Sequence, residues 1–242
     1  MLEKNVHEQV NAYISQYKYK IEMHAHSYPA SGCSKLAPKE FIGALKSAGY
    51  DAVVLTNHFC VVDPFIRNEE DLAVYMQNFR DVQAEGEKEG ITVIFGAEIW
   101  FDKNDFLVYG IDEAFMHQLL AVMPKTYEEF YEKFHSPDRL ILQAHPHRDT
   151  CHFMDASLMD GMELNYNPNE EAGVTHAGLY IRNNRIPIVV AGSDLHEKKQ
   201  LNACALRAKT LPKDGAELVQ LLKSKDYIFE IGGVPMFPYH HF

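Results

Sequence analysis

Seven short apolar segments recur along this chain of 242 residues, and stretches with a helical pattern separate most of them. Their length and their content of branched and aromatic residues are typical of buried β-strands. The alternation of strand and helix predicts parallel strands joined by right-handed crossovers. The expected strands are Tyr19–Met23, Ala52–Thr56, Thr92–Ala97, Phe106–Tyr109, Leu140–Gln143, Gly161–Leu164 and Ile188–Ala191.

Helical patterns fill most of the intervals between these strands. An amphipathic helix is expected over about residues 3–17. Pro38 suits the first turn of a second helix that ends at Gly49, because a proline in that turn forfeits no helical hydrogen bond. The remaining expected helices are Glu69–Glu89, which Gly90 closes, and Thr126–His135, Glu170–Asn183 and Asp214–Lys223.

Histidines and carboxylates follow five of the predicted strands, at the point where each strand ends. Imidazoles one residue apart on an extended backbone project to the same side, because strand side chains alternate with period two. Neutral imidazoles and converging carboxylates are ligands that suit a divalent transition metal. The sequence therefore predicts a metalloenzyme, with the motifs His24-Ala25-His26, Thr56-Asn57-His58, Gly96-Ala97-Glu98, Ala144-His145-Pro146-His147-Arg148 and Gly192-Ser193-Asp194-Leu195-His196.

A purely structural role is the alternative for each of these side chains taken singly. His24 and His26 would both enter the core on one face of a strand, which costs free energy unless they are bonded. Glu98 ends an apolar run, where an unpaired carboxylate is expensive and a bridging position between two metal ions removes the cost. Their joint placement at strand ends of the same polarity favours the metal site.

Five different strands supply these candidates, which favours a closed or nearly closed barrel over an open doubly wound sheet. A barrel carries its chemistry around the rim at the carboxyl ends of its strands, whereas an open sheet concentrates its site at one switch point. No linker rich in proline or glycine and no repeat divides the chain. We therefore expect an α/β fold with a single domain over residues 1–242, an N-terminal helix at about 1–18 and a C-terminal tail at about 228–242.

Composition narrows the classes of function. The formal net charge of −11 disfavours binding to nucleic acid or to an anionic membrane, and it permits a small phosphorylated molecule because metal ions supply positive potential locally. Four scattered cysteines without a Cys-x-x-Cys pair fit a reducing compartment. The first residues lack the apolar core of a signal peptide, and no apolar stretch reaches the roughly 18 residues of a membrane span. We therefore expect a cytoplasmic protein.

The motif series His-x-His, Thr-x-His, Gly-x-Glu, Ala-His-Pro and Gly-Ser-Asp-x-His, in this order, resembles the PHP (polymerase and histidinol phosphatase) superfamily of metal-dependent phosphoesterases. The resemblance covers about residues 19–200. It implies a distorted (β/α)7 TIM-like barrel that holds two or three divalent metal ions, which are zinc, manganese or iron. By position it assigns His24, His26, Glu98 and Asp194 to the first ion, Glu98 and His145 to the second, and His58 and His196 to the third.

The chain departs from the family pattern at three places. Asn57 precedes His58 where the family commonly has an aspartate. Cys33 is the only metal-competent side chain in the loop Ser27–Ser34, where the family often has a histidine or an aspartate. The nearest polar residue after the fourth strand is Asp112, where three-metal members have a histidine. A two-ion centre, a three-ion centre and a ligand role for Cys33 all remain open.

Residues that handle the substrate are expected near the same rim. Arg148 is the candidate phosphate clamp, because its guanidinium offers a fork of donors to phosphate oxygens; the alternative is a surface arginine paired with Asp149 or Glu163. His147 is either an acid–base residue or a solvent-exposed loop residue. The expected catalytic set is His147, Arg148 and Asp194, and the expected substrate-binding set is Lys35, Arg148 and Asn165.

The resemblance implies a metal-dependent hydrolase of phosphate esters, a phosphomonoesterase or phosphodiesterase that uses a metal-bound hydroxide. A small amidohydrolase is the first alternative, although those barrels need a bridging lysine after the fourth strand and Tyr109-Gly110-Ile111-Asp112 contains none. A metal-binding module without turnover is the second. The expected partner is a small phosphorylated substrate rather than a membrane or nucleic acid, and the sequence leaves the oligomeric state open.

Overall fold

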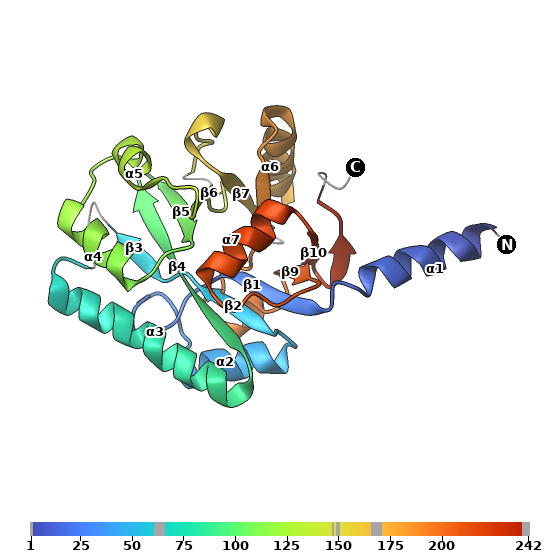
Figure 1. Ribbon diagram of the computed structural model, residues 1–242, viewed down its shortest axis with the longest axis horizontal. Coiled ribbons are helices and arrows are strands. Elements are labelled where there is room, and N and C mark those ends of the chain that lie inside the picture. The colour runs from blue at the N-terminus through green and yellow to red at the C-terminus, as the bar shows by residue number, and fades with distance from the viewer. Residues whose placement is uncertain (1, 61–65, 147, 149–150, 166–170, 239–242) are drawn as a thin grey trace.

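The computed structural model describes residues 2–60, 66–146, 148, 151–165 and 171–238 (Figure 1). Its strands are β1 (Tyr19–Ala25), β2 (Ala52–Leu55), β3 (His58–Cys60), β4 (Thr92–Phe101), β5 (Asn104–Tyr109), β6 (Leu140–Gln143), β7 (Gly161–Leu164), β8 (Ile188–Ala191), β9 (Cys204–Ala208), β10 (Tyr227–Ile231) and β11 (Val234–Met236). Its α-helices are α1 (Leu2–Ile14), α2 (Pro38–Ser47), α3 (Glu69–Glu89), α4 (Glu113–Val122), α5 (Tyr127–Phe134), α6 (Glu171–Asn184) and α7 (Gly215–Ser224).

All of these strands belong to one curled sheet that forms a half-barrel. Its order is β11-β10-β9-β1-β2-β4-β5-β6-β7-β8, and β3 pairs with β4 beside this path. Pairing is parallel from β1 through β2 to β4, and again from β6 through β7 to β8. Helix α3 packs on β4 and on α2, whereas α1 projects away from the sheet (Figure 1). Across the described residues, no helix has both the length and the apolar content needed to cross a membrane.

The seven expected strands are present as β1, β2, β4, β5, β6, β7 and β8. The expected parallel arrangement is wrong for β5, which runs antiparallel to both β4 and β6. The two-residue turn Asp102-Lys103 connects β4 to β5, and both residues have positive φ, 42° and 69°. A link this short joins antiparallel strands as a hairpin, because a parallel crossover needs about a dozen residues or more.

Several elements were not expected from the sequence, namely β3, β9, β10, β11 and α4. Strand β9 pairs antiparallel with β1 and β10 pairs antiparallel with β9, so the half-barrel continues beyond the first expected strand. Strands β10 and β11 lie within or at the border of the expected C-terminal tail. The (β/α)7 strand count of the family resemblance stays a prediction.

Backbone hydrogen bonds join the segment after β8 to the end of β1. His26 N donates to the carbonyl of Leu195 at 2.9 Å, and Leu195 N donates to the carbonyl of His24 at 3.0 Å. Ala25 and Leu195 thereby form an isolated parallel bridge. This bridge brings the first and the last of the candidate motifs together at the same edge of the sheet.

The apolar core lies beneath these strand ends. Ile21, Met23, Val54, Leu142 and Val190 belong to one cluster of buried side chains that spans β1, β2, β6 and β8. Their burial removes apolar surface from water, which is the main favourable contribution to folding. The polar residues that follow the strands are thus presented on a rigid base.

Candidate metal centre

Four buried side chains converge at the carboxyl ends of β1, β4 and β8. His24 and His26 lie at the end of β1, Glu98 lies in β4 and Asp194 follows β8. Nε2 of His24 lies 3.1 Å from Glu98 and 3.2 Å from Asp194, and Nε2 of His26 lies 3.3 Å and 3.1 Å from the same two carboxylates. One donor atom from each of the four lies within 4.8 Å of every other.

These donor atoms fit a shared cation better than a network of hydrogen bonds. Nε2 of His24 and Oε2 of Glu98 are buried, and within the described part of the chain neither makes a hydrogen bond of suitable direction. Charged groups are nevertheless close, since Glu98 Oε1 lies 3.1 Å from His24 Nε2 and His58 Nδ1 lies 2.8 Å from Glu98 Oε2. A buried polar atom without a partner costs about 1–3 kcal/mol. Two imidazoles and two carboxylates form a ligand set that zinc, manganese or iron accepts. The four residues therefore fit a divalent ion.

Glu98 also belongs to a second group, with His58 and Asp105. Strand register places His58 of β3 opposite Glu98 of β4, and His58 Nδ1 lies 2.8 Å from Glu98 Oε2. His145, which follows β6, has its Nε2 3.0 Å from Glu98 Oε1 and 3.7 Å from Asp105 Oδ2. Both oxygens of Glu98 thus face candidate ligands, as a carboxylate that bridges two ions requires.

A third group consists of His26, His58 and His196. The ring of His26 packs against both others, with centroid distances of 4.3 Å to His58 and 4.2 Å to His196. Cys33 adjoins this group, since its Sγ lies 3.1 Å from His196 Nε2. The structure therefore brings all seven predicted ligands together, and it places Cys33 beside them.

Opposite charges dominate the electrostatics of the cluster. Burial raises the pKa of Glu98 and of Asp194, but the neighbouring imidazoles, His24 foremost, hold both pKa values well below their usual range. Burial lowers the pKa of His58 and of His145, but hydrogen bonds and the charge of Glu98 raise these pKa values to about 11 and about 10. The carboxylates are therefore ionised, and the cluster holds positive charge either as imidazole protons or as metal ions that replace them.

Two of the candidate ligands have backbone conformations that residues other than glycine rarely adopt. The angle φ is 23° at His145 and 52° at Asp194, and both residues follow the end of a strand. Such conformations cost on the order of 1–3 kcal/mol and persist where the surroundings hold them. Here Glu163 Oε2 accepts a hydrogen bond from His145 N at 2.9 Å, and Gln200 Nε2 donates to the Asp194 carbonyl at 2.7 Å.

Glu163 of β7 is a buried supporting carboxylate to which the sequence alone assigned no role at the metal centre. Its Oε1 accepts a hydrogen bond from His24 Nδ1 at 2.9 Å, which leaves His24 Nε2 facing the cluster. Gly192 leaves room for this contact, because a Cβ at that position would meet Glu163 and lie 2.6 Å from the Cβ of His24. The sequence feature that points to Glu163 is its charge, because it is the charged residue within the otherwise apolar segment Gly161–Leu164.

Asp105 and Glu22 were missed as well. Asp105 lies in β5, one residue before the expected start of that strand. Glu22 Oε1 accepts hydrogen bonds from His24 N at 3.1 Å and from Ser193 N at 2.8 Å, and burial raises the pKa of Glu22 to about 7. The signal for Glu22 was its spacing, because alternate residues of a strand share a face and Glu22, His24 and His26 alternate.

Arg148 lies at the cluster, where its Nη2 forms an ion pair with Asp194 Oδ2. Of the two partners considered for a surface arginine, Glu163 bonds to the imidazole of His24, and Asp149 lies outside the described residues. His147 also lies outside the described residues.

The other two candidates for substrate binding have different surroundings. Asn165 is buried, and its Nδ2 donates a hydrogen bond to the carbonyl of Gly192 at 2.8 Å. Lys35 has a side chain that is 70% exposed and an ion pair with Glu197 at 2.8 Å. The structure therefore gives Asn165 a bond that supports the backbone after β8, and it does not bring Lys35 into the cluster.

The PHP domain family model matches residues 22–185 of this chain. No curated protein matches it. Among solved structures, a two-domain protein from Bacteroides vulgatus that contains a predicted PHP-like metal-dependent phosphoesterase has a TM-score of 0.63 and 15% sequence identity. The likeness covers 90% of this chain and 66% of that protein, so this chain spans slightly less than two thirds of it.

Two further structures are more distant in fold. An amidohydrolase from Chromobacterium violaceum, with bound sulfate and no metal, is 14% identical with a TM-score of 0.45 and covers 73% of this chain and 87% of its own. A protein from Bifidobacterium adolescentis, provisionally named a metal-dependent phosphoesterase, is 13% identical with a TM-score of 0.45, covering 85% and 96%. The family model matches well over half of the residues, and its range contains five of the seven clustered ligands. The chain belongs to the PHP domain family.

Proposed function

We propose that this PHP domain is a metal-dependent phosphoesterase that hydrolyses a small phosphate ester. The observation that carries the proposal is the central position of Glu98, whose Oε1 lies beside His24 and His145 and whose Oε2 lies beside His26 and His58. Neighbouring metal ions that share a carboxylate stabilise both the attacking and the leaving oxygen when a phosphate ester is hydrolysed. Membership of the PHP family and the likeness to a PHP-like fold support the same class of reaction.

Each ion has a set of residues that would hold it. When bound, the ions supply positive charge that activates water and neutralises the phosphoryl oxygens. The proposed sets are His24, His26, Glu98 and Asp194 for the first ion, Glu98, Asp105 and His145 for the second, and His58 and His196, with Cys33 adjacent, for the third.

The protein's own groups bind and orient the substrate. Arg148 offers a planar fork of donors at the edge of the cluster, and its ion pair with Asp194 keeps the guanidinium there. Glu163 fixes the ring of His24 and the backbone of His145, so that both imidazoles keep their direction without substrate. Little reorganisation is then needed when the phosphoryl group arrives.

An amidohydrolase is the less favoured reaction because of the residues that come directly after β5. Gly110 and Ile111 lead to Asp112, whose side chain accepts a hydrogen bond from Phe115 N at 2.8 Å and begins α4. The position at which those enzymes need a bridging lysine is thus occupied by a helix cap. The experiment below decides whether the protein is instead a metal-binding module without turnover.

The test uses protein stripped of metal by a chelator and reloaded with manganese, zinc or iron. Bound metal is counted by elemental mass spectrometry, and turnover is measured with p-nitrophenyl phosphate, bis(p-nitrophenyl) phosphate and p-nitroacetanilide. We expect phosphate esters alone to be hydrolysed, only by the loaded protein, and activity to fall below detection in Glu98→Gln. Glu113→Gln, which alters an exposed carboxylate of α4 that pairs with Arg80, is the control that should behave as the unaltered chain. Stoichiometric metal without hydrolysis of either phosphate ester would contradict the proposal.

A further inference from the structure

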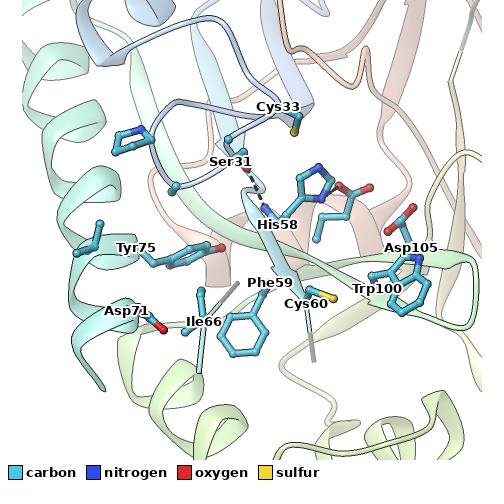
Figure 2. A pocket seen from close by; sticks show the side chains of 15 residues that line it. Ser31, Cys33, His58, Phe59, Cys60, Ile66, Asp71, Tyr75, Trp100 and Asp105 are labelled. Atoms are coloured by element: carbon cyan, nitrogen blue, oxygen red, sulfur yellow. Dashed lines mark hydrogen bonds and ion pairs between the residues drawn. The ribbon is translucent and has the colours of Figure 1, made fainter. Parts of the chain in front are cut away.

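A cavity of about 780 Å³ opens beside the ligand cluster, between β3, β4, α3 and the loop after β1 (Figure 2). One end of the cavity is lined by three residues that also belong to the cluster, His58, Glu98 and Asp105. A phosphate group occupies only a fraction of this space, which lies in the range of about 300–1,000 Å³ typical of sites for small organic ligands. A phosphate ester bound at the cluster would therefore place its organic part in the cavity.

The walls away from the cluster are apolar and rich in rings. Val74 of α3 lines the cavity and is 58% exposed, so part of this apolar surface is open to solvent. Aromatic side chains offer flat faces and edges against which a ring packs favourably. Figure 2 shows the other principal apolar side chains, which are Phe59, Ile66, Tyr75 and Trp100.

The polar groups in these walls are already hydrogen-bonded. Tyr75 Oη donates to the carbonyl of Asn57 at 2.9 Å. Ser31 Oγ donates to Asn57 Oδ1 at 3.0 Å and accepts from the backbone N of His58 at 3.0 Å. A ligand with many hydroxyls, such as a sugar, would give up hydrogen bonds to water on entering and would find few partners in return. The cavity therefore favours an organic group with few polar atoms.

The walls also lack positive charge. Among the described residues that line the cavity, none is a lysine or an arginine. Asp71 lies at the edge, where its carboxylate accepts hydrogen bonds from the backbone N of Arg67 at 2.9 Å and from its Nε at 3.2 Å. A second phosphate or a nucleic-acid backbone would thus meet neutral or negative groups beyond the cluster.

We propose that this cavity binds the organic group of the substrate, and that the substrate is a phosphate ester of an uncharged alcohol that carries an aromatic ring. The inference rests on the proposed phosphoesterase function. In the reaction, the oxygen of a water molecule forms a bond to phosphorus while the bond between phosphorus and the alcohol oxygen breaks. One proton of the water passes to the alcohol oxygen, so the products are the free alcohol and inorganic phosphate.

Binding can be measured without turnover, because Trp100 is the single tryptophan of the chain and lines the cavity. The metal-loaded protein is titrated with benzylphosphonate and with methylphosphonate, neither of which has an ester bond to hydrolyse. We expect benzylphosphonate to change the tryptophan fluorescence and to bind at least about 10-fold more tightly, since burial of a ring contributes more than 1.4 kcal/mol. Equal affinities for the two phosphonates would overturn the inference.

A substitution in the cavity wall tests whether the cavity, and not the cluster alone, determines the preference for the aromatic phosphonate. Val74→Asp places a charge on an exposed side chain of the wall, where it would lie beside the ring of the ligand. We expect the ratio of the two phosphonate affinities to fall toward one. Val6→Asp is the matched control, because Val6 is 56% exposed on α1, away from the cavity, and should leave the ratio unchanged. Circular dichroism verifies that both variants fold, and an unaltered ratio in Val74→Asp would count against the assignment.

Turnover distinguishes this inference from the proposed function. Catalytic efficiency is compared for benzyl phosphate, glycerol 3-phosphate and glucose 6-phosphate, and we expect the first to exceed the other two by at least about 10-fold. Hydrolysis of all three with equal efficiency would overturn the substrate class and would leave the phosphoesterase function intact. Tight binding of benzylphosphonate without hydrolysis of any ester would contradict the function and, with it, the substrate assignment.

Discussion

Glu163 fixes the direction of His24, since its Oε1 accepts a hydrogen bond from Nδ1 at 2.9 Å. We expect Glu163→Gln to weaken metal binding about 10- to 100-fold, because a neutral amide of the same size orients the ring less strongly and lowers its basicity. Calorimetric titration of metal-free protein with zinc or manganese measures the Kd. Glu113→Gln is the surface control, and an unchanged Kd in Glu163→Gln would exclude the supporting role.

The thiol of Cys33 responds to its imidazole neighbours. Burial raises the pKa of Cys33, but hydrogen bonds to His196 and His58 outweigh this effect and lower the pKa to about 6. In metal-free protein we therefore expect alkylation by iodoacetamide to increase with pH, to be half-maximal near pH 6 and to level off above it, because the thiolate is the nucleophile.

Mass spectrometry of the peptide that contains Cys33, over about pH 5 to 9, gives the midpoint of this alkylation. Cys204 is fully buried and serves as an internal control that should react slowly throughout. A midpoint near the ordinary cysteine value of about 8.5 would show that the two imidazoles do not act on the thiol in this way.

Residue types at strand ends were sufficient to predict that the imidazoles and carboxylates of the five motifs converge, whereas the carboxylates that support them could not be assigned. His24, His26 and Asp194 are recognisable because imidazoles and carboxylates are costly at the end of an apolar segment. For Asp105 and Glu163 the pairing register of the strand decides the face to which the side chain points, because a slip of one residue reverses that face. Pairing with neighbouring strands sets the register, and the local sequence does not contain it.

The hairpin between β4 and β5 is an element whose turn residues are not the most favourable ones. Lys103 has φ of 69°, a conformation that glycine adopts without penalty. We expect Lys103→Gly to raise the free energy of unfolding by about 0.5–1 kcal/mol, because a two-residue turn of this kind prefers glycine at that position.

Urea unfolding monitored by circular dichroism measures this change. Ala84→Gly is a control with the opposite sign: Ala84 is exposed in the interior of α3, and glycine there should lower stability by about 1 kcal/mol. A loss of stability in Lys103→Gly comparable to that in Ala84→Gly would show that the turn does not favour glycine.

Elements with strong local signals were predicted with their bounds. Helix α3 has the predicted bounds Glu69–Glu89, because Asn68 accepts hydrogen bonds from two backbone N–H groups at its start and Gly90 ends it with φ of 70°. The orientation of β5 was not predicted, since pairing direction depends on partners far away in the sequence. The same reason applies to β9 and β10, which are short apolar segments that pair antiparallel at the far side of β1.

Protonation of the cluster couples to the stability of the whole molecule when metal is absent. The pKa values of His58 and His145, about 11 and about 10, lie above the value of about 6.5 for an unfolded chain. The folded state therefore binds more protons than the unfolded state between these values, and stability decreases as pH rises through that window. We expect metal-free protein to unfold at lower urea concentration at about pH 9 than at about pH 6.5.

Metal-loaded protein is the comparison, because bound ions replace the protons and should remove this decrease. The urea concentration at the unfolding midpoint is measured at both pH values, with and without metal, and its change with pH is compared between the two forms. A metal-free midpoint that rises with pH over this range would contradict the charge state derived for the cluster.

The hydrogen bonds between the backbone at Ala25 and at Leu195 have a consequence for the order of events in synthesis. His26 and Asp194, which they bring together, are 168 positions apart in the chain. A ribosome that has released the first histidines must add most of the remaining polypeptide before the opposing carboxylate emerges. The residue set proposed for the first ion is therefore complete only after Asp194 has left the exit tunnel, late in synthesis.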